Sequence, residues 1–118
     1  MFLLFALYAC FVHPIGYGYG RASFYGAEQP KRNHHRPMAN GRPFRPEALT
    51  AASYEFPLGT VVEVTNLANG RRVVVTVTDR GPARKLGRLI DLSEGAARVI
   101  DARRAGIADV AIMVRRYA

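Results

Sequence analysis

The sequence predicts a mainly β domain: a small barrel of five or six short strands with one or two small helices. The chain has 118 residues, which is the size of a single domain. Short runs of β-branched residues are separated by turn signals rich in glycine, asparagine and proline, a pattern typical of small barrels. Hydrophobic residues make up 49% of the chain and charged residues 22%, values typical of a folded domain rather than a disordered or fibrous one.

The N-terminal run Met1–Val12 is apolar and uncharged, but it is shorter than the roughly 20 residues that span a bilayer. It matches the apolar middle of a secretory signal without the usual positively charged start. We therefore predict that residues 1–19 are a truncated signal or lipoprotein-type leader with a linker, and that residues 20–118 form the domain. Leu7–Cys10 is similar to a lipobox, so a membrane tether through a lipidated Cys10 and an inert cysteine both stay open.

The first half of the chain predicts three strands and one long loop. Arg21–Tyr25 is the first strand-like run, and the proline-rich basic segment Ala27–Pro46 that follows is a long loop. Thr60–Thr65 and Arg72–Thr78 are rich in valine and threonine. Because Asn69–Gly70 between them suits a tight turn, these two runs predict a β-hairpin.

The second half predicts two more strands and a helix. Arg88–Leu92 is strand-like, and Ser93 after it is suited to cap a helix from Glu94 to about Arg103, with Gly106 just beyond its end. The last strand is predicted over Val110–Arg115, where Val110, Ile112 and Val114 share one face by the two-residue period.

Asp79 is the main candidate for chemistry from the residue pattern. It follows the alternating residues Val73, Val75 and Val77, so strict alternation places it on the valine face, at the lip of the barrel. Desolvation there would favour the protonated carboxyl that a general acid needs. The alternatives are that Asp79 caps the turn Arg80–Pro82 or pairs with Arg80.

Other polar and aromatic residues are weaker candidates. His34 and His35 are adjacent in an extended segment, with no acidic or cysteine partner nearby, so we expect a solvated loop and no metal site. Asn40 and Gly41 predict a turn that could also contact a ligand. Phe24 and Tyr25 could stack on a sugar or base, although one of them should belong to the core.

The chain carries 17 Lys and Arg against 9 Asp and Glu, a net charge of +8 that favours polyanionic partners. Its arginine pairs, Arg103–Arg104 and Arg115–Arg116, lack the interleaved aromatic residues of a single-strand nucleic-acid binder. We therefore interpret them as solvated surface and expect no nucleic-acid partner.

A series of short motifs, in this order and spacing, resembles the rare lipoprotein A family of bacterial septal-ring lytic transglycosylases. The motifs are Gly20–Gly26, Ala39–Gly41 with Phe44, Ala48–Ala52, Pro57–Thr60, Val64–Leu67, Asn69–Gly70, Asp79–Pro82 and Ile90–Ser93. The resemblance covers about residues 20–114. It implies a six-stranded double-psi β-barrel, the barrel also found in expansins, and a polysaccharide substrate.

The resemblance also implies the reaction and its residues. Lytic transglycosylases cut glycan strands without water, because the C6 hydroxyl of N-acetylmuramic acid attacks its own C1 and leaves a 1,6-anhydro ring. The family's catalytic aspartate matches Asp79, and the position of the family's functional histidine is Ser53 here. Tyr25, Asn40, Gly41 and Arg80 are the expected substrate contacts.

Two further residues match the family pattern, and we assign Asp91 a structural role in the barrel and Ser93 the helix cap. Phe24 stands where the family usually has tryptophan.

From this resemblance we expect an endolytic peptidoglycan transglycosylase of the cell envelope that prefers strands without stem peptides and uses no cofactor. The alternative is a non-catalytic wall-binding barrel in which the same residues only hold glycan. We expect export to the periplasm, a monomer, and division-site proteins as further partners.

Overall fold

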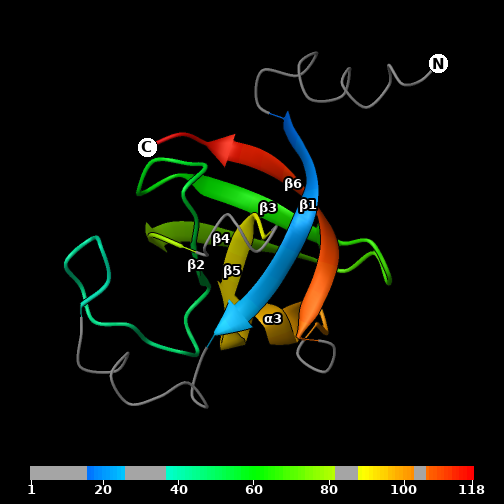
Figure 1. Ribbon diagram of the computed structural model, residues 1–118, viewed down its shortest axis with the longest axis horizontal. Helices are drawn as coiled ribbons and strands as arrows, with labels where there is room; N and C mark the ends of the chain where they lie inside the picture. The colour runs from blue at the N-terminus through cyan, green and yellow to red at the C-terminus, as the bar shows by residue number, and fades with distance from the viewer. Residues whose placement is uncertain (1–15, 26–36, 82–87, 103–105) are drawn as a thin grey trace.

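The computed structural model describes residues 16–25, 37–81, 88–102 and 106–118. Six strands close into one barrel in the order β1-β5-β2-β4-β3-β6, and one short helix covers an end of it (Figure 1). The predicted mainly β barrel of six strands is therefore confirmed. Residues 1–15 of the predicted leader and linker, with Cys10, and the loop residues His34 and His35 lie outside the described residues, whereas residues 16–19 belong to the first strand.

The strands are short, apart from the first and the last. Their bounds are β1 Gly16–Tyr25, β2 Thr50–Ala52, β3 Val61–Asn66, β4 Arg72–Asp79, β5 Ile90–Ser93 and β6 Ile107–Arg116, and the helix is α3 Glu94–Val99. The pairs β1–β5 and β2–β4 are parallel and the other four pairs are antiparallel, so the barrel is mixed. Among the described residues no helix is long and apolar enough to cross a membrane.

The predicted hairpin is β3 and β4. Val64 pairs with Val73 and Thr65 with Arg72, and the connecting turn runs from Asn66 to Arg71. Gly70 has a φ of 78° in this turn, a conformation that is costly for residues with a Cβ atom. The Asn-Gly signal therefore located the turn correctly.

Alternating apolar side chains from all six strands fill the barrel. Val110, Ile112 and Val114 of β6 are buried, as the two-residue period predicts, and they join Val73, Val75 and Val77 of β4 in one core cluster. Phe24 is partly buried and packs against this cluster.

The first strand begins earlier than predicted, at Gly16 instead of Arg21. It extends this far because it pairs with the long strand β6, from Gly16 opposite Met113 to Ser23 opposite Ile107. The glycine-rich composition of residues 16–20 concealed this strand, since glycine is depleted in strands.

Helix α3 is capped by Ser93 as predicted, because the Ser93 hydroxyl accepts a hydrogen bond from the Ala96 N–H at 3.2 Å. Its predicted end near Arg103 was wrong. Asp101 adopts a left-handed φ of 55°, and the N–H groups of Asp101 and Ala102 donate to the carbonyls of Arg98 and Ala97. These two bonds form a Schellman motif that ends the helix before Gly106, with aspartate in the place usually taken by glycine.

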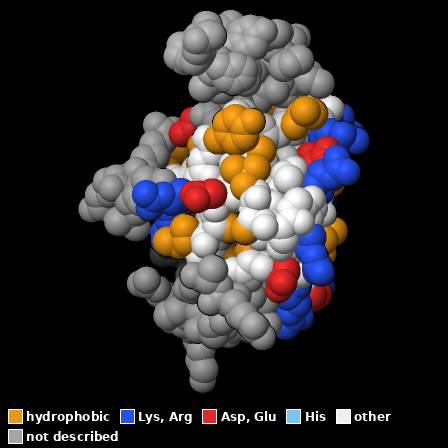
Figure 2. All heavy atoms as spheres, turned by 90° about the vertical axis from the view of Figure 1, so that its right-hand side faces the viewer, with side chains coloured by type: hydrophobic (Ala, Val, Ile, Leu, Met, Phe, Trp, Pro, Cys, Tyr) orange, Lys and Arg blue, Asp and Glu red, His pale blue; other side chains and the backbone are white. Residues whose placement is uncertain are grey.

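Much of the positive charge lies on the barrel surface. Figure 2 shows basic side chains along one side of its face, with acidic side chains between them. Arg72 and Arg115 both approach the Glu63 carboxylate, at 3.5 and 2.9 Å, while their own side chains stay more than half exposed. Arg115 and Arg116 are exposed, in agreement with the interpretation as solvated surface, whereas the pair Arg103–Arg104 lies outside the described residues.

Candidate active site

Asp79 lies at the C-terminal end of β4, where the alternation of the strand is broken. Ala51 of β2 pairs with Val77 and Ala52 pairs with Asp79, so Thr78 is an extra residue in a β-bulge. Thr78 is buried and Asp79 is half-buried. The expectation that Asp79 shares the valine face was therefore wrong, because the bulge turns its side chain onto the face opposite the core.

The loop before β2 holds the Asp79 carboxylate. The Ala39 N–H donates to Asp79 Oδ1 at 2.9 Å, and the Arg80 N–H donates to the same oxygen at 2.8 Å. The Asn40 N–H donates to the Thr78 carbonyl at 3.2 Å, and the Thr78 hydroxyl donates to Met38 Sδ at 3.3 Å. No described residue donates to Oδ2, so that oxygen is the one available to a ligand.

The predicted turn at Asn40 and Gly41 is present. Asn40 Oδ1 accepts from the Arg42 N–H at 3.0 Å, the Gly41 N–H donates to the Met38 carbonyl, and Gly41 has a φ of 87°. The Asn40 side chain thus shapes the turn while its own backbone ties the turn to β4. Both residues are exposed beside Asp79.

Ser53 directly follows β2 and reaches Asp79 through the backbone. Its N–H donates to the Asp79 carbonyl at 3.0 Å. Its hydroxyl is fully buried, donates to the Leu89 carbonyl at 3.1 Å and accepts from the Glu55 N–H at 3.0 Å. The position matched to the family histidine therefore carries a hydroxyl that is engaged inside the protein.

Arg80 braces the end of β4. Its Nη1 donates to the Ser53 carbonyl at 3.1 Å and to the Phe56 carbonyl at 2.8 Å. The predicted alternative that Asp79 pairs with the Arg80 side chain is not what the structure has; the Arg80 backbone N–H contacts Asp79 instead. The segment after β2 is thereby fixed beside the carboxylate, with the aromatic side chain of Tyr54 47% exposed.

Tyr25 is not brought into this group by the fold. It ends β1, where its backbone pairs with Ser93 of β5, and both β5 and β2 lie between β1 and β4. The structure therefore joins Asp79, Ser53, Arg80, Asn40 and Gly41 at one end of β4.

Asp91 is the titratable group that the sequence led us to assign a purely structural role. Ile90 and Leu92 are in the core, so Asp91 between them lies on the opposite face of β5. The Ser23 hydroxyl donates to Asp91 Oδ1, and Arg88 Nε lies 3.9 Å from the same oxygen. Desolvation by burial raises the pKa of Asp91 to about 6, against the opposing charge of Arg88. A single acidic residue inside an apolar strand is the signal that could have drawn attention to it.

A family model described as lytic transglycolase matches residues 18–112 of the chain. The chain belongs to this family. The match includes residues of all six strands and both Asp79 and Asp91.

Two relatives named as peptidoglycan transglycosylases are similar to most of this chain. The chain is 53% identical over 95 residues to the probable endolytic peptidoglycan transglycosylase RlpA of Nostoc sp., covering 80% of this chain and 25% of that protein. It is 44% identical over 95 residues to the endolytic peptidoglycan transglycosylase RlpA of Campylobacter jejuni, covering 80% of this chain and 33% of that protein. The chain thus spans a quarter to a third of the length of these relatives.

A solved structure outside these relatives has a similar barrel. An expansin variant of Clavibacter michiganensis, solved in complex with cellohexaose, superposes with a TM-score of 0.62 at 26% identity, over 83% of this chain and 50% of that one.

Metal-ligating side chains do not gather in the part of the chain that the structure describes. In the described ranges, no group of three His, Cys, Asp or Glu side chains is placed to hold a metal ion.

Proposed function

We propose that this domain is a lytic transglycosylase that cuts peptidoglycan glycan strands and prefers strands without stem peptides. The observation that carries the proposal is the Asp79 carboxylate, which two backbone N–H groups orient at the end of the barrel with Oδ2 left for a ligand. Membership of the lytic transglycosylase family and the RlpA relatives support the reaction class.

The reaction needs proton transfer but no water. The C6 hydroxyl of N-acetylmuramic acid forms a bond to C1 of the same sugar, and the bond from C1 to the leaving glycosidic oxygen breaks. The leaving oxygen gains a proton and the C6 hydroxyl loses one, so a carboxyl group that exchanges protons with the substrate accelerates both changes. Asp79 is placed to do this, and the product is a 1,6-anhydro end.

The polysaccharide itself would lie over the exposed turn at Asn40 and Gly41 and beside Tyr54. Exposed aromatic rings next to a carboxyl group are suited to sugar faces, since they bury large areas at little entropic cost. The likeness to an expansin solved with cellohexaose supports a glycan chain as the occupant.

A non-catalytic wall-binding barrel is the second candidate, and one observation favours it. Ser53 stands at the position of the family histidine and its hydroxyl is engaged inside the protein, so that position supplies no titratable group. Such a barrel would bind glycan through the same surface without cutting it.

Mass spectrometry of naked glycan strands after incubation with the purified domain separates these candidates. The expected result is release of fragments with 1,6-anhydro ends. Strands that co-sediment with the domain but stay uncut would establish the binding module instead. Reducing ends formed with uptake of water would show a hydrolase and overturn the transglycosylase assignment.

We also propose that the domain acts outside the cytoplasm, because its proposed substrate lies there. A fusion of residues 1–36 to a reporter that is active only after export tests this. A silent reporter would contradict it.

A further inference from the structure

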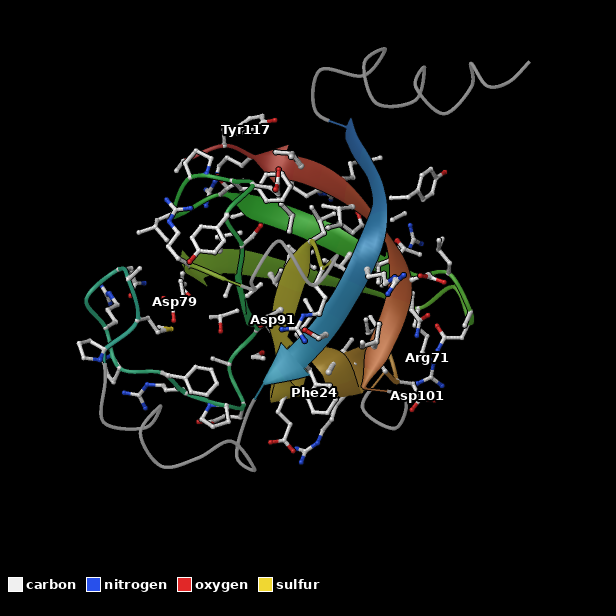
Figure 3. The ribbon with its side chains drawn as sticks, viewed as in Figure 1. Phe24, Arg71, Asp79, Asp91, Asp101 and Tyr117 are labelled. Carbon is white, nitrogen blue, oxygen red and sulfur yellow. The ribbon has the colours of Figure 1, made fainter. Side chains whose placement is uncertain are left out.

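Two carboxyl residues lie in one row across three neighbouring strands. Ala52 of β2 pairs with Asp79 of β4 on one side and with Asp91 of β5 on the other. Ser23 of β1 pairs with Asp91 and continues the row. Figure 3 shows Asp79 and Asp91 with β2 passing between them.

The row lies on the outer face of the barrel. Ala51, Val77 and Leu92, which precede or follow members of the row, all belong to the core cluster. Residues paired across neighbouring strands point to the same side of a sheet, and successive residues point to opposite sides. Ala52, Asp91 and, through the bulge, Asp79 therefore share the side away from the core.

The spacing of the two carboxyl residues suits a bond placed between them. Two strand spacings separate their α-carbons by about 10 Å. The residue between them is Ala52, whose side chain is a single methyl group. An acid and a base that flank a glycosidic bond from two sides are the arrangement by which most enzymes that cut such bonds work.

The two carboxyl groups have different surroundings, as distinct roles require. Asp79 Oδ1 accepts two backbone N–H groups. Asp91 is faced by the Ser23 hydroxyl from β1, the Ala52 methyl from β2 and the Arg88 guanidinium before β5, and its side chain is only 19% exposed. Burial, partly opposed by Arg88, raises the pKa of Asp91 to about 6, near that of an effective proton donor at neutral pH.

We propose that Asp91 is a second catalytic residue, which donates the proton to the leaving glycosidic oxygen while Asp79 accepts the proton of the C6 hydroxyl. This assignment rests on the proposed transglycosylase function and divides its proton transfers between two residues. It also supplies the titratable partner that Ser53 lacks.

The step balances without any further reactant. The C6 oxygen bonds to C1 and passes its proton to the Asp79 carboxylate. The bond between C1 and the leaving oxygen breaks, and that oxygen takes the proton of the Asp91 carboxyl. Asp91 ends ionised and Asp79 ends protonated, and proton exchange with solvent restores both before the next turnover.

The test compares the wild type with Asp91→Asn, which keeps an oxygen for the Ser23 hydroxyl but carries no acidic proton. Asp109→Asn is the matched control, since Asp109 is exposed on β6 and lies outside the row. Cutting of naked strands is followed across pH 4.5 to 8. Asp91→Asn is expected to lose about 10²–10⁴-fold in rate and Asp109→Asn less than about twofold.

A second variant tests the assignment without removing either carboxyl group. Arg88→Gln removes the positive charge that lowers the pKa of Asp91. In the wild type the rate should fall as pH rises above about 6, where Asp91 loses its proton. In Arg88→Gln this fall is expected about one pH unit higher. The same change at the exposed Arg98, which pairs with Glu94, should leave the profile in place.

The outcomes separate the two proposals. A wild type that produces no anhydro ends overturns the proposed function itself. An active wild type with a folded Asp91→Asn that cuts as fast as Asp109→Asn leaves the function standing and overturns the role of Asp91. If Asp91→Asn does not fold, the pH profile of Arg88→Gln decides, and an unshifted profile overturns the role.

Discussion

The two ends of β4 treat their polar side chains in opposite ways. At the start of β4, the Asn66 and Asn69 amides both donate to the Ile100 carbonyl, at 2.9 and 3.0 Å, and their oxygens accept from the N–H groups of Ala68 and Arg71. At its far end, Asp79 keeps one oxygen without a donor from the described residues, and Asp91 two strands away is desolvated. In Figure 3, Arg71 and Asp101 mark the first end and Asp79 the second.

This difference indicates that the asparagine end of β4 stabilises the fold and that the Asp79 end is available for catalysis. Polar groups whose partners are all internal stabilise the chain and offer nothing to a ligand. At the other end, the Asp79 carboxylate has one oxygen without a donor from the described residues, and burial favours the protonated form of the Asp91 carboxyl. Such groups lower the stability of a fold and are typical of functional sites. A cavity of about 450 Å³ lies at the asparagine end and is lined in part by Asn66, Asn69 and Asp101. The polar groups at this end already have internal partners, so we do not assign the active site to this cavity.

The largest expected effect is on activity at the carboxyl end. Asp79→Asn should lower the rate of strand cutting by about 10²–10⁴-fold, because the amide keeps the size but cannot exchange a proton. Its cost in stability should stay near 1 kcal/mol, as for a lost cap. Anhydro-end release and thermal unfolding by circular dichroism measure the two effects. Equal cutting by the variant would show that Asp79 is not used.

The next largest effect is on the stability of Asp91→Asn, which we expect to be higher than that of the wild type at neutral pH. The pKa of Asp91 is raised from 3.8 to about 6 in the folded state. As pH rises from about 4 to 6, the unfolded chain therefore gives up the Asp91 proton while the folded chain still holds it. The free energy of unfolding of the wild type falls over this range. Asp91→Asn should remove that loss and be more stable than the wild type at pH 7 by on the order of 3 kcal/mol. Urea unfolding at pH 4 and pH 7 measures this. A destabilised variant at pH 7 would show that Asp91 holds the fold.

At the asparagine end the expectation reverses. Asn66→Ala removes a buried amide that holds both the β3–β4 turn and the end of α3, and should cost about 2–3 kcal/mol. Cutting rates measured well below the unfolding temperature should be unchanged. Loss of activity in a fully folded Asn66→Ala protein would mean that the two ends are coupled.

The smallest effect is expected at Ser53. Ser53→Ala leaves the Leu89 carbonyl and the Glu55 N–H without their hydroxyl partner, at a cost of about 1–2 kcal/mol, while the rate should change less than about threefold. Urea unfolding and strand cutting measure these values. A loss of rate comparable to that of Asp79→Asn would place the hydroxyl in the reaction.

The hairpin, the last strand and the helix cap could be predicted because each depends on neighbours in the chain. Alternation of valines, an Asn-Gly turn and a serine before a helix act over a few residues. The early start of β1 at Gly16 and the end of α3 at Val99 could not, because the first depends on pairing with β6 and the second on a backbone conformation that aspartate adopts only in some contexts.

The candidate site shows the same limit. Asp79 could be singled out from the pattern and from a family resemblance. Its face could not, because the bulge at Thr78 is set by pairing with β2. Its hydrogen bond to Ala39, 40 residues away in the chain, and the row that joins it to Asp91 arise only when the barrel closes.

The bulge at Thr78 also shows how a closed barrel can acquire or lose a reactive group. One residue inserted into β2 opposite Thr78 would restore strict alternation and turn the Asp79 carboxyl toward the apolar interior, although no catalytic residue had been substituted. Keeping the Asp79 carboxyl accessible then requires selection to preserve the register between β2 and β4, and not only the aspartate itself. In related barrels, a single inserted or deleted residue near this aspartate could move its side chain to the other face of the sheet. We expect such a protein to have lost the catalytic role of the aspartate although the residue itself is still present.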